Sequence, residues 1–301
     1  MFEGMNLGMN LRRWLRTLPF ERFRNPPPRV AVVRLEGVIS ASTSRLRRGQ
    51  ISLETLDATL ERAFSLPDVA AVALCVNSPG GSPVQSSLVA GRIRALADEN
   101  KVPVYAFVED VAASGGYWLA CAADEIHADA GSLVGSIGVV YAGFGFSDLI
   151  ARHGVERRLH TAGTSKAMLD PFLPEAPDDV KRLNEAQADL HATFKNWVRE
   201  RRGERLQGAE DELFSGAFWT GRKALTLGLV DAIGDLRAAM RERFGDKVTF
   251  VRLCCRRYGE VVSPAVPVRS ERRWSTVRYR RSTTAPCGLA SACSSTEVSV
   301  K

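Results

Sequence analysis

Two patterns of apolar and polar positions alternate along the first half of the chain. The first is a short, nearly continuous apolar run, found at 30–35, 70–76 and 102–108. The second is a three- to four-residue apolar spacing, found near 52–65, 84–99 and 115–123. Such runs are typical of buried strands, and such spacing is typical of amphipathic helices. The alternation predicts an α/β domain with parallel strand pairing, whose active residues lie at the carboxyl ends of the strands.

A long helix is predicted over 177–202. Pro177, Asp178 and Asp179 stand at its start, arginines stand near its end, and Gly203 follows as a stop signal. Proline in the first turn and opposite charges at the two ends suit the geometry and dipole of a helix. Shorter helices are predicted over 222–227 and 236–244, and no segment repeats, so the chain holds one copy of its unit.

Charge divides the chain of 301 residues into parts. The formal net charge is +7, but the segment 253–301 holds nine Lys or Arg and three Asp or Glu and so carries +6 of it. This basic, Ser- and Cys-rich tail has no apolar period, and we expect it to be disordered. Because the basicity belongs to the tail, we expect no nucleic-acid partner. The expected division is an N-terminal segment over 1–28, a single domain over 29–252 that carries the chemistry described below, and the tail.

The segment 1–28 interleaves apolar residues with arginines. It lacks the continuous apolar core of a secretory signal, and no stretch of the chain approaches the roughly 20 apolar residues that span a bilayer. We therefore expect a cytoplasmic protein whose amphipathic N-terminus can rest on a membrane surface. Cys75 and Cys121 sit in apolar surroundings typical of inert thiols, and no pattern predicts a metal or a cofactor.

Ser114 is the candidate nucleophile. It follows the strand-like run at 102–108, in the string Ala113-Ser114-Gly115-Gly116. A hydroxyl at a strand-to-helix turn without bulky neighbours is exposed and can be aimed at a carbonyl. The alternative is that this serine only caps the next helix. A second glycine turn, Asn77–Gly81, ends another buried run, and two such turns can each supply a backbone N–H to one oxyanion hole.

A serine nucleophile needs a base. None of the four histidines, His127, His153, His160 and His191, stands in a motif that marks a triad, although a histidine base stays open. Lys166 lies among small and apolar residues and is the other candidate. An ordinary lysine is almost entirely protonated at pH 7, so this role requires apolar surroundings. The Ser136 hydroxyl is the candidate for orienting its amine.

Taken in order, these strings resemble the signal peptide peptidase A (protease IV) family of bacterial serine peptidases over residues 30–234. The motifs that carry the resemblance are Ser78-Pro-Gly-Gly81, Ala113-Ser-Gly-Gly-Tyr117, Gly135-Ser-Ile-Gly-Val139, Lys166 before Pro171-Phe172, Trp219-Thr-Gly-Arg222 and Gly228-Leu-Val-Asp231. We expect the chain to depart from the family pattern in having no N-terminal membrane anchor, and it carries Trp118 where a second tyrosine is more usual.

The resemblance implies a Ser/Lys dyad. Ser114 would be the nucleophile, Lys166 the general base and Ser136 its support, while the N–H groups of Gly81 and Gly115 would form the oxyanion hole. It also implies the crotonase and Clp-protease fold of repeated β-β-α units, and a homo-oligomeric ring in which serine and lysine meet across a subunit boundary.

The expected function is therefore that of a serine endopeptidase that cleaves apolar peptides, such as signal peptide remnants or membrane-protein fragments. Two alternatives stay open. A catalytically silent ring that only binds peptides would not depend on Lys166. A crotonase-type acyl-CoA enzyme would bind CoA, and the joint presence of Ser114 and Lys166 argues against it.

Overall fold

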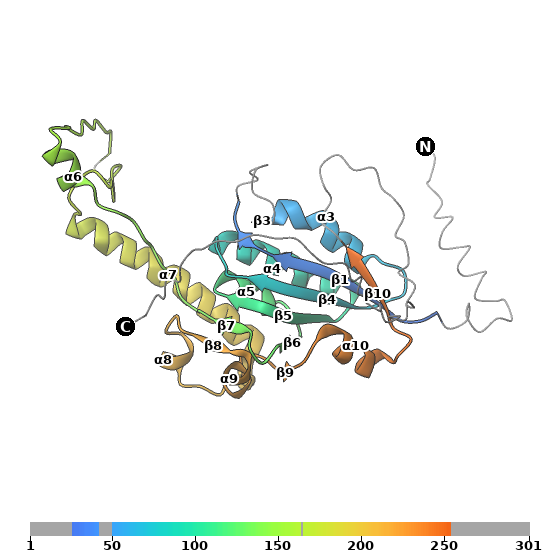
Figure 1. Cartoon of the computed structure of the whole chain (residues 1–301). Coiled ribbons are helices and arrows are strands. Elements are labelled where there is room, and N and C mark those ends of the chain that lie inside the picture. The colour runs from blue at the N-terminus through green and yellow to red at the C-terminus, as the bar shows by residue number, and fades with distance from the viewer. Residues whose placement is uncertain (1–25, 42–49, 164, 254–301) are drawn as a thin grey trace, which may run out of the picture. The chain divides into compact units, whose positions relative to one another are not determined.

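A computed structural model describes residues 26–41, 50–163 and 165–253 of the chain. Within these residues an eight-stranded sheet has the order β10-β1-β4-β5-β6-β9, and neighbours along this order pair in parallel (Figure 1). Strand β7 pairs with β5 in parallel and with β8 in antiparallel fashion. The strands are β1 (Arg29–Glu36), β4 (Val69–Ser78), β5 (Val104–Ala113), β6 (Glu125–Ala128), β7 (Leu133–Gly135), β8 (Phe218–Thr220), β9 (Ala232–Ile233) and β10 (Thr249–Leu253).

A small parallel pair, β2 (Val38–Ile39) and β3 (Gln50–Ile51), lies beside the sheet. It is joined to the second glycine turn by a parallel bridge between Ile39 and Gly81. The helices are α3 (Leu53–Phe64), α4 (Pro83–Asn100), α5 (Gly115–Ala120), α6 (Ser147–Arg152), α7 (Pro177–Arg202), α8 (Glu210–Leu213), α9 (Gly221–Thr226) and α10 (Leu236–Phe244), with a 3-10 turn at Gly203–Arg205.

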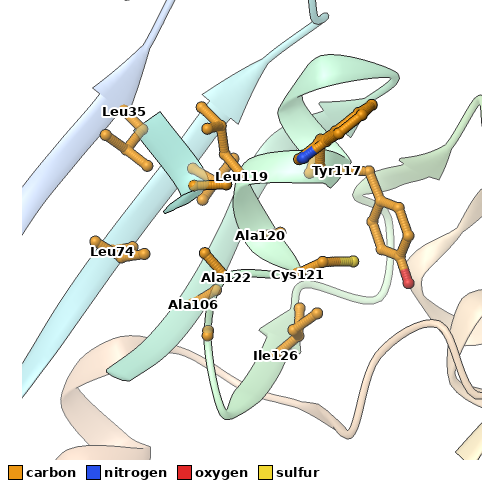
Figure 2. Close-up of a cluster of buried hydrophobic side chains, with 14 of the residues drawn as sticks. Leu35, Leu74, Ala106, Tyr117, Leu119, Ala120, Cys121, Ala122 and Ile126 are labelled. Carbon is orange, nitrogen blue, oxygen red and sulfur yellow. The ribbon is translucent and has the colours of Figure 1, made fainter. Parts of the chain in front are cut away.

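Alternation of side chains along the strands creates two cores. Helices α3, α4 and α5 pack on one face, and Figure 2 shows Leu119 and Ala122 close to Leu35 and Leu74 of β1 and β4. Helix α10 covers part of the other face, where Met240 joins a cluster that includes residues of β1, β4 and β5. Each fully buried leucine contributes roughly 1.5–3 kcal/mol, so burial on the first face is the main force that holds α5 in place.

The predicted α/β class with parallel pairing is confirmed. Strand β5 runs on to Ala113, five residues beyond the apolar run that predicted it. The extension carries Glu109 and Asp110, whose carboxylates bind Arg34 of β1 and Asn77 of β4. These polar residues fall outside the core, so the apolar run stopped before the strand did.

Among the described residues, no helix has both the length and the apolar character needed to cross a membrane. The predicted division of the chain stays a prediction, because most of the segment 1–28 and nearly all of the tail lie outside the described residues. Strand β10 includes Leu253, the first residue of the predicted tail.

Candidate active site

Ser114 stands between β5 and α5, at the carboxyl end of a central strand. Its backbone has φ 52° and ψ −121°, in a region that residues with a side chain rarely adopt. Holding such a conformation costs on the order of 1–3 kcal/mol, and it is the strained strand-to-helix turn that exposes a nucleophile. The Ser114 side chain makes no capping hydrogen bond to α5. Ser114 thus occupies the N-cap position of α5, but its hydroxyl does not cap the helix.

Backbone contacts fix this turn from both sides. The Ser114 N–H donates to the Gly135 carbonyl of β7 at 2.8 Å, and the Ser114 carbonyl accepts from the Trp118 N–H at 3.0 Å. All six residues of α5 are buried. The Tyr117 hydroxyl donates to the Leu229 carbonyl at 2.8 Å, and Figure 2 shows its ring beside α5. The helix after Ser114 is thus anchored at its first turn.

The second glycine turn packs directly against Ser114. A Cβ atom placed on Gly80 would lie 2.8 Å from the Gly115 nitrogen, 2.8 Å from the Ala113 carbonyl oxygen and 2.9 Å from the Ser114 Cβ. These separations are too short for any side chain, and Gly80 also has φ +102°. Gly80 therefore permits the close approach of the two turns. The sequence prediction missed it, although it adjoins Gly81 in the same motif.

The N–H groups of Gly81 and Gly115 come from these two touching segments. The bridge to β2 uses the Gly80 carbonyl and the Ser82 N–H, which bond the Ile39 N–H and carbonyl at 2.9 Å each. Gly81 lies between these two groups. In a parallel bridge, a residue in this position directs its own N–H away from the partner strand, which here is β2. Gly115 is the first residue of α5, so its N–H has no acceptor within the helix. Neither the bridge nor the helix therefore uses these two N–H groups.

Ser136 directly follows β7, the strand that pairs with the end of β5. Strands β5 and β7 pair in parallel with Ala113 opposite Gly135, so Ser114 and Ser136 each follow a paired position. Ser136 also has a positive φ, 53°, and its N–H donates to the Ala217 carbonyl at 2.7 Å. The structure therefore places Ser136 at the same sheet end as Ser114.

Lys166 lies apart from this cluster, in an exposed segment between α6 and α7. Its N–H donates to the Gly163 carbonyl at 3.3 Å. Within the described part of the chain, its amine forms no hydrogen bond or ion pair, and none joins it to Ser114. The lysine borders a surface hollow of about 390 Å³ whose apolar lining includes Leu159, Met168 and Phe172. A single chain therefore does not bring the two predicted dyad residues together.

The histidines have other surroundings. His127 is buried, with its ring stacked on Phe107 at 4.9 Å and its Nε2 2.9 Å from the Glu125 carboxylate. His191 on α7 lies 3.1 Å from the Ile137 carbonyl. His153 and His160 are exposed. No histidine of the described chain forms a hydrogen bond with Ser114.

A family model described as "Peptidase family S49" matches residues 96–246, which is half of the chain. The match includes Ser114, Ser136 and Lys166 and begins after the Gly80–Gly81 turn. Three relatives cover most of this chain. A Brucella abortus protein named Na(+)/H(+) antiporter NhaA is 51% identical over 234 residues, which are 78% of this chain and 32% of that protein.

The other two relatives are peptidases by name. Protease 4 of Haemophilus influenzae is 31% identical and covers 72% of this chain and 35% of its own length. The chloroplastic serine protease SPPA of Arabidopsis thaliana is 31% identical, and the match covers 70% of this chain and 31% of that protein. The chain thus spans about a third of the length of these relatives. A solved structure of a 1510-N membrane-bound stomatin-specific protease variant with a substrate peptide has a TM-score of 0.47 at 16% identity, and covers 76% of this chain and 94% of that one.

Proposed function

The chain belongs to peptidase family S49, and from this membership we propose that it is a serine endopeptidase with Ser114 as its nucleophile. The observation that carries the proposal is the strained Ser114 turn packed against Gly80, with two backbone N–H groups beside it. A metal-free, cofactor-free hydrolysis requires only these donors and a base.

The proposed mechanism has two half-reactions. The Ser114 hydroxyl attacks a peptide carbonyl while its proton passes to the neutral amine of Lys166, and the N–H groups of Gly81 and Gly115 stabilise the oxyanion. Collapse breaks the C–N bond, and the leaving amine takes the proton from Lys166. Water then attacks the acyl-enzyme, with Lys166 again accepting a proton, and releases the acid and the Ser114 hydroxyl. Ser136 orients the lysine amine.

We propose that the active site forms between subunits of a homo-oligomeric ring. Lys166 is exposed in the single chain, whereas a neutral lysine requires a dry environment. The same part of the chain exposes apolar side chains, including Val140 at 87% and Phe144 at 80% of their full surface. Burial of these residues by a neighbouring subunit would cover apolar surface and could enclose the lysine in one step.

Apolar, extended peptides, such as signal peptide remnants or membrane-protein fragments, are the proposed substrates. The hollow at Lys166 supports this, because Leu159, Met168 and Phe172 border it and can accept an apolar side chain near the base. We also propose that the protein acts in the cytoplasm, where its N-terminal segment allows peripheral contact with a membrane.

The test is activity-based labelling with a fluorophosphonate, together with cleavage of an apolar fluorogenic peptide. We expect Ser114→Ala to abolish both, and Lys166→Ala to reduce cleavage by at least about 100-fold while the fold is retained. Lys181→Ala on α7, another exposed lysine, is the matched control and should retain full activity. Labelling that persists in Ser114→Ala would refute the assignment. Full cleavage by Lys166→Ala would refute the dyad.

A further inference from the structure

The carboxylate of Asp170 accepts three hydrogen bonds that hold the loop carrying Lys166. Asp170, four residues after the lysine, has a side chain only 9% exposed. Its Oδ2 accepts hydrogen bonds from Arg157, at 3.0 Å from Nη2 and 3.2 Å from Nε. Its Oδ1 accepts the Phe172 N–H at 3.0 Å. One side chain therefore joins the loop to the segment before it and closes the turn after it.

Further contacts hold the same loop. Leu169 has φ 57°, a conformation that a residue with a side chain keeps only under constraint, and its N–H donates to the Asp179 carboxylate in the first turn of α7 at 3.2 Å. The Phe146 N–H donates to the Pro171 carbonyl at 2.6 Å. The Arg157 guanidinium lies over the Phe172 ring, 5.7 Å from its centre.

We call the paired side chains of Asp170 and Arg157 the clamp. The opposite charges of these two residues agree with the geometry of their hydrogen bonds. The Phe172 N–H, and then the hydrogen bond and charge of Arg157, hold the pKa of Asp170 below its ordinary value despite its burial. The carboxylate is thus ionised throughout the neutral range and always able to bind Arg157. A lysine side chain has four rotatable bonds, so the position of its amine depends on how firmly the backbone beneath it is held.

We propose that Asp170 and Arg157 are positioning residues that fix the Lys166 backbone so that its amine reaches the nucleophile. The inference rests on the proposed role of Lys166 as the base. A displacement of about 1 Å of a catalytic group can cost on the order of 100-fold in rate. Arg157 and Asp170 also border the hollow that we propose accepts a substrate side chain. Loss of their pairing should therefore lower kcat by a larger factor than it raises KM.

The test compares four variants by steady-state peptide cleavage. Asp170→Asn keeps an oxygen for the Phe172 N–H but loses the charge that binds Arg157, and we expect kcat to fall about 10- to 100-fold with a smaller change in KM. Arg157→Ala should lower kcat by a similar factor. Arg157→Lys keeps the positive charge and should retain part of the kcat that Arg157→Ala loses. Arg158→Ala is the matched control, because its ion pair with Glu156 is 77% and 71% exposed and should not affect kcat.

Circular dichroism and light scattering on each variant separate positioning from collapse of the fold or the assembly. Unchanged kcat in Asp170→Asn, with Lys166→Ala inactive, would overturn this inference and leave the proposed function standing. Loss of folding or of assembled mass in both Asp170→Asn and Arg157→Lys would also overturn it, since the clamp would then be structural. Full activity of Lys166→Ala would overturn the proposed function and this inference together.

Discussion

Ser114 is held in its strained backbone conformation by residues that allow close approach rather than by residues with reactive groups. Gly80 is the clearest case, since its Cα faces the Gly115 nitrogen and the Ser114 Cβ. A side chain at this position would push apart the two turns that supply the proposed oxyanion donors. The close packing of the two turns therefore requires that residue 80 has no Cβ atom.

Gly80→Ala is expected to reduce kcat by about 100-fold or more, because loss of a single oxyanion donor costs that much. The new methyl group would also meet a positive φ of 102°. Gly91→Ala is the matched control. Gly91 lies inside α4 with no atom within 4 Å of an added Cβ, so the change should raise the free energy of unfolding by roughly 0.5–1 kcal/mol without affecting cleavage. Peptide cleavage and urea denaturation of both variants measure this difference, and equal activities would contradict it.

A buried ion pair near α5 depends on pH. The Arg202 side chain is 1% exposed and binds Asp231 through Nη1 at 2.7 Å and Nη2 at 2.9 Å. Burial raises the pKa of Asp231, but the hydrogen bonds and charge of Arg202 and the Ile126 N–H lower it by more, so its net pKa lies below the ordinary value. A depressed pKa stabilises the fold above the ordinary carboxyl value. This contribution is lost as the pH falls through the folded-state pKa.

Asp231→Asn should accordingly lower the free energy of unfolding at pH 7 by about 3–5 kcal/mol, because it leaves Arg202 buried without its counter-ion. The difference from the wild type should shrink at an acid pH below the folded-state pKa of Asp231, where its carboxylate becomes protonated. Asp98→Asn removes an exposed partner of Arg94 and should change stability by less than about 1 kcal/mol at either pH. Urea denaturation at the two pH values tests both statements. A difference that does not depend on pH would contradict the electrostatic explanation.

At the scale of elements, the sequence predicted those with enough residues to show a period. Strands β1, β4 and β5 and helices α3, α4, α5, α7, α9 and α10 were all expected near their observed bounds. The strands β2, β3, β6, β7, β8, β9 and β10 were not. Six of these have two to four residues, and in such strands the pairing partner, rather than an apolar pattern, decides the conformation.

The same limit applies to the site. Ser114 and the two glycine turns could be found because each is a local signal at the end of an apolar run. The Gly80 contact could not be found, because it depends on how β4 and β5 pair. Lys166 was identified from its neighbours, but its placement depends on Arg157, Asp179 and the proposed partner subunit, which the local string does not encode.

Helix α7 connects the lysine loop to the nucleophile helix. Its first turn binds Leu169 through Asp179, and near its other end the Trp197 Nε1–H donates to the Trp118 carbonyl of α5 at 3.0 Å. Phe194 stacks on the Trp118 ring at 4.6 Å. The last carbonyl groups of a helix have no N–H donor within that helix. Trp197 of α7 therefore supplies a donor to the Trp118 carbonyl of α5.

Trp197→Phe should therefore cost about 1–3 kcal/mol of unfolding free energy, because the buried Trp118 carbonyl loses its donor. Since α5 begins directly after Ser114, we also expect kcat to fall. Asn196→Ala changes the exposed neighbour on the same turn and should alter stability by less than about 0.5 kcal/mol. Thermal denaturation and peptide cleavage measure the two effects. Equal stability of the two variants would show that the Trp197 hydrogen bond does not support α5.

On the scale of the whole molecule, one described segment exposes more apolar surface than an isolated chain explains. Between β7 and α7, the side chains that are at least about two fifths exposed include Val140, Tyr141, Phe144, Leu149 and Val155. Scattered apolar residues are normal on a surface, but a run of them in the segment that also carries Lys166 supports the proposed subunit interface. Assembly and catalysis would then share the same residues.

A mixing experiment tests whether the active site is shared between subunits. Ser114→Ala and Lys166→Ala chains are each expected to be inactive, but in a co-assembled ring the intact serine of one can meet the intact lysine of the other. Random mixing in equal amounts would restore about one quarter of the sites, since each needs one chain of each kind in the right order. A mixture of Lys166→Ala with Ser114→Ala would thus regain activity, whereas Ser114→Ala mixed with the double variant would not. If both mixtures stay inactive while light scattering shows co-assembly, serine and lysine must act within one chain. The exposed loop would then have to move towards Ser114 of its own subunit.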